Sequence, residues 1–265
     1  MVKLARQIRF AVSPFEASIE GSNSYCAKPT ADGLSLFFAI WIELKGIVDK
    51  DTGFVVNVSD IDKIVRKKAV KIFDEFIKQK FRLKKQVSFE QIGQLLSQVW
   101  KTIEKNFLPA KIDSLTLELM PKRKIAIKER MGNMLYISEK FEFAASHTLW
   151  NNRFSDKENE RVFGKCANRK GHGHNYIVEV TIKKSAKGKT LCAGDFENIV
   201  EKEFIRLVDH KNLNADVEHF KKVNPTVENI AQFAFKCLKA KLKPLQLDCV
   251  TVWENDRTFC SFRAD

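Results

Sequence analysis

The five histidines of the chain all lie in its second half, and three of them have a spacing that suits a metal site. His172 and His174 are separated by one residue, and the segment after them reads as a β-strand. Because side chains at i and i+2 of a strand point to the same face, both imidazoles can reach one ion. His147 ends an earlier apolar segment, which is expected to be a strand that can lie alongside the strand of His172 and His174. Three imidazoles with an open fourth position are typical of a catalytic Zn²⁺ site, although such a pair also makes ordinary hydrogen bonds.

Two further groups could move protons. Cys166 lies six residues before His172. A nearby cation would lower the pKa of its thiol and make it a thiolate base, but Cys166 could equally be a fourth metal ligand or a small buried residue. Asp209 adjoins His210, and a carboxylate beside an imidazole can tune it as an acid or a base, or can merely cap a loop.

Hydrophobic periodicity predicts the elements that carry these residues. In the second half, strands are expected at 135–147, 173–183, near 190–193, 248–254 and 257–262. Helices are expected at about 195–207, with Asp195 as a plausible N-cap, and after Pro225 and Thr226 to about residue 241. The segment between His147 and His172 is expected to be a loop.

The first half repeats this order. Its expected strands are 7–12, 34–45, 54–58, 114–119 and 124–128, and its expected helices are 60–79 and 89–106. The prediction is an α+β fold made of two tandem units, each a four-stranded antiparallel sheet with two helices on one face. The units are expected to span residues 1–130 and 131–265, with the break at Gly132.

Four ordered stretches of the second half resemble the 6-pyruvoyltetrahydropterin synthase family, over nearly all of residues 134–265. Gly164–Tyr176, GKCANRKGHGHNY, is similar to the family's zinc and cysteine motif. The other three stretches are FEFAASHTL at 141–149, LVDHKNLNADVEHF at 207–220, and NPTVEN at 224–229 followed by VTVWEND at 250–256. The resemblance implies the tunnelling fold, in which subunits associate so that their sheets close into a barrel, and hence a homo-oligomer.

The resemblance also implies a substrate, 7,8-dihydroneopterin triphosphate, and a role for each matching residue. His147, His172 and His174 would hold Zn²⁺, and Cys166 would be the general base. Asp209 and His210 would form a proton relay. The remaining matches concern the pterin ring: Glu254 would anchor it, and Thr226 and Glu228 would be secondary contacts. Val227 departs from the family pattern, which usually has a second Thr, so that contact is left open.

The same scaffold serves a second activity. The 6-carboxytetrahydropterin synthases of queuosine biosynthesis act on the same substrate, and this activity remains the alternative. The spacing from Cys166 to His172 and the GHGHNY motif are closer to those of the pyruvoyl enzyme. A tandem tunnelling-fold binding protein without catalysis is a more distant alternative. A reductase of related fold that reduces a nitrile would need a nucleophilic Cys in a different sequence motif, and no such motif is seen.

The first half cannot build this zinc site, because residues 1–146 contain no histidine. In the register of the repeat, Asp32 and Leu34 stand where His172 and His174 stand, and Cys26 matches Cys166. We therefore expect residues 1–130 to be a degenerate repeat that completes the barrel or supplies an interface.

Composition narrows the class of protein. The formal charge of +13 is concentrated in the first half, much of it on a helical segment where lysines form a solvated face, and no nucleic-acid-binding motif accompanies it. Nucleic acid is therefore an unlikely partner. No apolar run has the length of a membrane span, and no signal peptide is evident. Six scattered cysteines are expected to be reduced thiols of a cytoplasmic protein.

Overall fold

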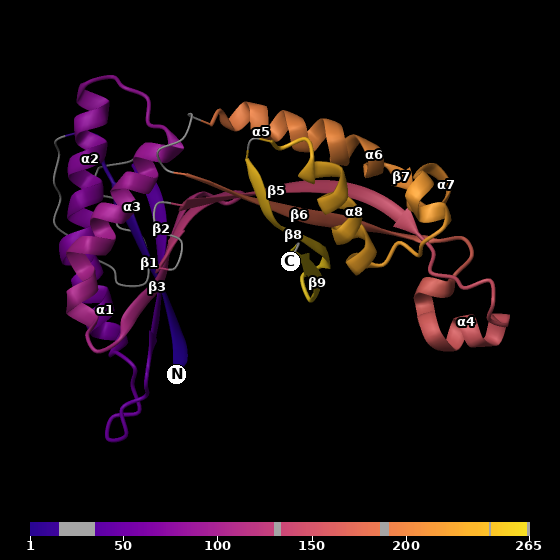
Figure 1. Cartoon of the computed structure of the whole chain (residues 1–265), viewed down its shortest axis with the longest axis horizontal. Coiled ribbons are helices and arrows are strands. Elements are labelled where there is room, and N and C mark those ends of the chain that lie inside the picture. Colours follow the sequence, from indigo (N-terminus) through magenta and orange to yellow (C-terminus); the bar gives the residue numbers. More distant parts are fainter. Residues whose placement is uncertain (16–34, 130–133, 186–190, 244, 264–265) are drawn as a thin grey trace. The chain divides into compact units, whose positions relative to one another are not determined.

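A computed structural model of the chain describes residues 1–15, 35–129, 134–185, 191–243 and 245–263 (Figure 1). The chain forms two compact units. Unit 1 contains Met1–Ile137 and a short segment that begins at Lys184, and unit 2 contains Ser138–Lys183 and the rest of the chain from Leu191. The predicted break at Gly132 lies outside the described residues. Within the described part, no helix is long and apolar enough to cross a membrane.

Unit 1 is an antiparallel sheet covered by helices on one face, as Figure 1 shows. Its strands, in sheet order, are β1 Val2–Val12, β2 Leu36–Gly46, β3 Lys111–Met120 and β4 Arg123–Lys128. Its helical segments are α1 Val58–Ile64, a π-helical turn Val65–Val70, α2 Lys71–Arg82 and α3 Phe89–Ile103. The core includes Phe73 of α2, which packs its ring 5.3 Å from that of Phe10 on β1.

The sequence prediction for unit 1 is wrong at one strand. Residues 54–58 are not a strand, because the side chain of Asn57 accepts a hydrogen bond from the backbone N–H of Ser59 and α1 already begins at Val58. An N-cap of this type satisfies a donor that the first helical turn leaves free, and it competes locally with an extended conformation.

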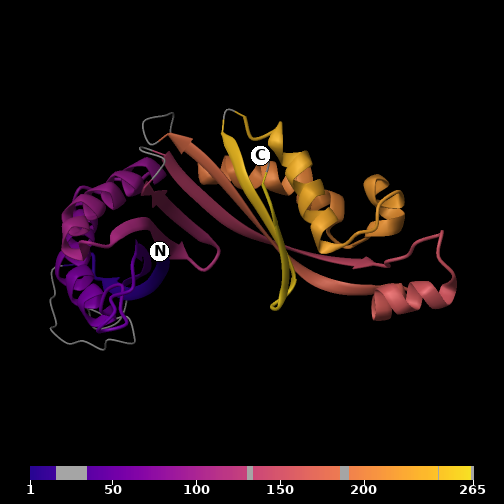
Figure 2. The same cartoon turned by 60° about the horizontal axis from the view of Figure 1, so that its bottom comes forward.

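Unit 2 repeats the same plan with the next strands of the sheet order, and the first residues of its first strand and the last residues of its second strand are counted in unit 1. Its sheet order is β5 Met134–His147, β6 His172–Ser185, β8 Gln246–Asn255 and β9 Thr258–Phe262. Its helical segments are α4 Asp156–Phe163, α5 Ala193–Val200, a π-helical turn Glu201–Ile205, α6 Arg206–Val208, α7 Leu213–Asp216 and α8 Val227–Lys239. Figure 2 shows α5 and α8 on the same side of the sheet. The α+β fold class is thereby confirmed.

Four details of unit 2 differ from the prediction. The expected short strand near 190–193 is not formed by its described residues, because Ala193 already opens α5. Asp195 is not the N-cap: it lies in the first helical turn, where its charge favours the helix dipole, and Cys192 stands at the cap position. The expected loop after His147 contains α4, and a two-residue strand, β7 Lys211–Asn212, runs parallel to the end of β5.

One buried ion pair in unit 1 gives a stability prediction. Lys184 and Glu90 are each only 7% exposed, and the Lys184 ammonium contacts the Glu90 carboxylate. Replacing Lys184 by Met is expected to lower the free energy of unfolding by about 3–5 kcal/mol, because it removes the cation that faces a buried carboxylate. Urea unfolding measures this change.

The matched control for that prediction is the exposed pair Lys63–Asp60. Lys63→Met should change the free energy of unfolding by about 0.5 kcal/mol or less, because water already screens both charges. Equal effects of the two substitutions would show that the Lys184–Glu90 pair is not desolvated as the structure indicates.

Candidate functional site

Three imidazoles meet at one end of the unit 2 sheet. His147 is the last residue of β5, and His172 and His174 lie at the start of β6. One ring nitrogen from each lies within 4.8 Å of the other two, and Nε2 of His147 is 3.1 Å from Nε2 of His172. The i, i+2 spacing on β6 therefore places both rings on the side of the sheet where His147 ends.

Local hydrogen bonds suit these imidazoles to a metal. The buried His147 Nδ1 donates to the carbonyl of Pro225 at 2.8 Å, so its Nε2 carries the lone pair. Nε2 of His174 is buried and has no hydrogen-bond partner among the described residues. Burial is the main cause that lowers the pKa of His147 and His174, so both rings are neutral at pH 7. Each of these nitrogens can offer a lone pair toward one point, so the donor set fits a metal ion.

The carboxylate of Glu254 completes this group from β8. Its Oε1 is 3.6 Å from Nε2 of His147 and 3.6 Å from Nε2 of His174. Ligand atoms of a tetrahedral zinc, at bonds of about 2.0–2.1 Å, lie about 3.3–3.4 Å apart. Glu254 thus stands beside the position that the imidazoles define.

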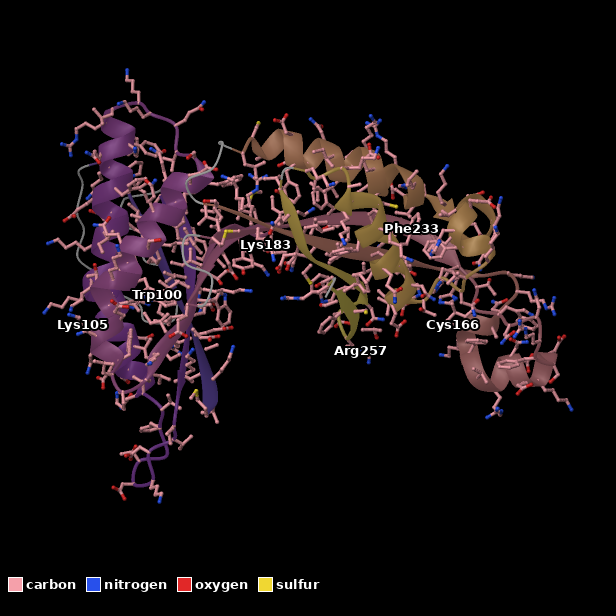
Figure 3. All side chains as sticks on the ribbon, viewed as in Figure 1. Trp100, Lys105, Cys166, Lys183, Phe233 and Arg257 are labelled. Carbon is pink, nitrogen blue, oxygen red and sulfur yellow. The ribbon has the colours of Figure 1, made fainter. Side chains whose placement is uncertain are left out.

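Cys166 lies in a 3₁₀ turn that follows α4, where Figure 3 labels it. Its Sγ is 3.7 Å from Nε2 of His172. Burial, and then the charge of Glu254, raise the pKa of this thiol. The expected lowering of the Cys166 pKa therefore does not come from the protein groups alone and would require a cation at the imidazoles.

Three asparagine side chains hold the chain that follows the first histidine. Asn214 accepts from the backbone N–H of Thr148 at 2.8 Å and donates to its carbonyl at 3.0 Å. Asn224 accepts from the N–H of Trp150 at 3.0 Å. Asn159 is fully buried and donates to three backbone carbonyls of the next turn. The sequence analysis did not single out any of these three asparagines. The only sequence feature that could have indicated them is the high frequency of Asn in this part of the chain.

Gly171 allows the cysteine loop to approach the first histidine. Its φ is +74°, and a Cβ there would lie 3.2 Å from the carbonyl oxygen of His147. Gly171→Ala is expected to lower zinc affinity about 10–100-fold, because the strained backbone displaces ligand residues that neighbours now hold in place. Zinc titration against a competing chelator measures this affinity.

Gly53→Ala is the matched control for that substitution. Gly53 has a φ of +73° but nothing within 4 Å of its Cβ position, and it lies in unit 1. It should show a similar backbone strain with unchanged zinc affinity. A similar loss of zinc affinity in both variants would show that the Gly171 contact does not position the histidines.

Comparison with known proteins identifies the family to which the second half of the chain is similar. The family model described as 6-pyruvoyl tetrahydropterin synthase matches residues 136–265. The human 6-pyruvoyl tetrahydrobiopterin synthase is 36% identical over 132 residues, which are 49% of this chain and 91% of the human protein. The chain belongs to the 6-pyruvoyl tetrahydropterin synthase family.

A second curated relative agrees with this placement, and a solved structure is also similar to the chain. The 6-pyruvoyl tetrahydrobiopterin synthase of Poecilia reticulata is 37% identical over 141 residues, covering 52% of this chain and 93% of that protein. The solved structure of the Caenorhabditis elegans 6-pyruvoyl tetrahydropterin synthase is 31% identical, with a TM-score of 0.46, and it covers 50% of this chain and 96% of its own. The family match thus includes every histidine discussed above and Cys166.

The predicted Asp209–His210 pair of this family member is formed. Asp209 Oδ2 lies 2.8 Å from His210 Nδ1, and Oδ1 accepts from the backbone N–H of Ala144 at 2.9 Å. That backbone hydrogen bond is the main cause that lowers the pKa of Asp209. The His210 side chain is 82% exposed, and it lines a pocket of 410 Å³ together with His174. His210 and His174 therefore border the same pocket.

Thr226 and Glu228 lie at the start of α8. The Thr226 hydroxyl is the N-cap and accepts from the backbone N–H of Asn229 at 3.4 Å. Glu228 is exposed in the first helical turn. Both follow Pro225, whose carbonyl holds His147, so this helix start is tied to the imidazole cluster.

Proposed function

We propose that this member of the family is a zinc-dependent lyase that converts 7,8-dihydroneopterin triphosphate to 6-pyruvoyltetrahydropterin with elimination of triphosphate. The observation that carries the proposal is the convergence of three imidazoles beside a thiol, in a sequence whose relatives are named 6-pyruvoyl tetrahydrobiopterin synthase.

His147, His172 and His174 would hold the Zn²⁺ through their ring nitrogens. Nitrogen ligands and a site with three protein ligands suit a catalytic zinc. When bound, zinc acts as a Lewis acid that polarises substrate oxygens and acidifies the adjacent C–H groups. The hydrogen bond from His147 to Pro225 fixes the tautomer that this ligation needs.

Cys166 would take a proton from the substrate side chain as the general base. The thiol is half-buried next to His172, so it faces the part of the substrate that lies at the imidazoles. Asp209 would orient His210, and His210 would exchange protons with the substrate from the wall of the 410 Å³ pocket. The Ala144 hydrogen bond holds Asp209 ionised and in place for this role.

The position of Glu254 refines its proposed role. A carboxylate 3.6 Å from two imidazoles can accept hydrogen bonds from the hydroxylated side chain of the substrate, which lies next to the metal. We propose that Glu254 anchors the pterin ring and that Thr226 and Glu228 are secondary contacts. Its position beside the imidazoles would also let it face the substrate side chain.

The alternative product is that of a 6-carboxytetrahydropterin synthase, which acts on the same substrate. Incubating the zinc-loaded protein with 7,8-dihydroneopterin triphosphate and identifying the product by mass spectrometry separates the two. The pyruvoyl product with one triphosphate released is expected. Zinc-loaded protein that leaves the substrate unchanged would overturn the enzymatic proposal and favour a binding protein.

Residues 1–130 are proposed to be a degenerate repeat that supplies an interface or completes the barrel of a homo-oligomer. The support is the repeated order of strands and helices in unit 1, together with the lack of histidine in that half. The family model begins only at residue 136, which agrees with a divergent first half. The cytoplasmic location stays a prediction, and a matching role for Cys26 lies outside the described residues.

A further inference from the structure

Tyr176 is a buried polar residue next to the imidazole cluster with no role in the mechanism above. It lies on β6 two residues after His174 and is 0% exposed. Its hydroxyl is buried and has no hydrogen-bond partner among the described residues. A hydroxyl shielded in this way costs stability unless an acceptor reaches it.

The ring of Tyr176 is fixed by its neighbours. It stacks on Phe143 with ring centroids 4.8 Å apart and planes 10° apart. It also lies edge-on to His174, at 5.5 Å, and to His147, at 6.3 Å. A phenylalanine would make the same ring contacts, so the hydroxyl adds nothing to this packing that the structure shows.

The hydroxyl is close to the reactive groups of the site. In the β6–β8 register, Ile177 pairs with Trp253, so Tyr176 and Glu254 are the residues that adjoin this pair on the two strands. Burial, and then the charges of Glu254 and Cys166, raise the pKa of the phenol, so it stays a neutral hydrogen-bond donor at pH 7. The Tyr176 ring lies edge-on to His147 and His174, so this donor stands at the imidazole cluster that Glu254 and Cys166 also approach.

We propose that the Tyr176 hydroxyl is a ligand-binding group that donates a hydrogen bond to an oxygen on the side chain of the bound pterin. This inference rests on the proposed function, because it takes a hydroxylated pterin as the ligand. Tyr176 would bind and orient the side chain beside Cys166, and so distinguish pterins that carry side-chain hydroxyls from those that lack them.

This contact can be tested by comparing the affinities of two protein variants for two ligands. Calorimetry on zinc-loaded wild type and Tyr176→Phe would measure the affinity for neopterin, which has side-chain hydroxyls, and for 6-methylpterin, which lacks them. We expect Tyr176→Phe to lose about tenfold in affinity for neopterin and less than twofold for 6-methylpterin. Zinc content should be unchanged, and the melting temperature should stay the same or rise, because the substitution removes a buried hydroxyl that has no partner in the described part of the chain.

Three results would overturn the inference. Unchanged affinity for both pterins would show that the hydroxyl touches neither, and equal losses for both would show that Tyr176 acts through the shape of the site. A lower melting temperature with loss of zinc would assign the hydroxyl a structural role. Tyr136→Phe, at a buried tyrosine in unit 1, is the control and should leave both affinities unchanged. Wild type that binds neither pterin would instead overturn the proposed function, and this inference with it.

Discussion

His174→Ala is expected to abolish zinc binding and turnover together. The substitution removes one of the three nitrogens that lie within 4.8 Å of one another. Loss of a direct ligand should exceed the 10–100-fold cost of losing an outer-shell partner. His174 suits the experiment because its side chain is partly exposed, so its truncation disturbs the core less than truncation of the fully buried His147.

Two measurements check this expectation. Zinc content after dialysis should fall from one ion per chain to none, and added zinc should no longer raise the melting temperature. A ligand that binds only the folded state stabilises it by about 2.7 kcal/mol at 100 times its Kd, so the wild-type shift is readily measured. Turnover of 7,8-dihydroneopterin triphosphate should disappear in parallel.

His219→Ala is the matched control for this substitution. His219 is another half-buried imidazole of unit 2, stacked on Phe233 at 4.8 Å, and it is not part of the cluster. This variant should keep its zinc and its activity. A His174→Ala protein that retains one zinc ion and full turnover would show that the metal site lies elsewhere.

The sequence predicted the framework of the site because strand geometry is local. Alternation along β6 placed His172 and His174 on one face, and the apolar run of β5 placed His147 at a strand end. Both inferences need only local strand signals, namely the two-residue period of side chains and a run of apolar residues. The α8 start was predicted for the same reason, since the Thr226 cap and the apolar stripe after it are both local signals.

The sequence could not predict contacts that depend on tertiary structure. The carbonyl of Pro225 reaches His147 across 78 residues, and no local pattern encodes that contact. The position of Glu254 depends on the β6–β8 register and on an irregularity near the end of β8, between Trp253 and Asn255. The family resemblance gave Glu254 a role but no distance to the imidazoles.

Short elements were the other class of error. Helix α4, Asp156–Phe163, is mostly charged, so its periodicity is weak and it was expected to be a loop. The buried Asn159 fixes the turn before it through its side-chain amide. The residues 54–58 in unit 1 were misassigned because Val55, Val56 and Val58 favour strands, whereas the Asn57 cap starts a helix. In both places an asparagine side chain supplies hydrogen bonds that the hydrophobic pattern does not indicate.

Cys166→Ser is expected to reduce kcat by about 10²–10⁴-fold while zinc binding is retained. This is the range by which a positioned general base accelerates a reaction. Serine has nearly the same shape, but its hydroxyl ionises far less readily than a thiol. Because Cys166 is the proposed base and not one of the three nitrogen ligands, its loss should act on the chemical step. Steady-state kinetics and chelator competition for zinc measure the two effects separately.

The zinc measurement decides between the base and a fourth ligand. Cys166 Sγ lies 3.7 Å from Nε2 of His172, which is close enough for a thiolate to join the imidazoles around one ion. A fourth ligand would make Cys166→Ser lower zinc affinity strongly, and the site would then be closed in the manner of a structural zinc. Cys192→Ser, at an exposed cysteine of the same unit, controls for thiol loss in general. Unchanged zinc affinity with a large loss of kcat, in Cys166→Ser alone, is the result that a thiolate base requires.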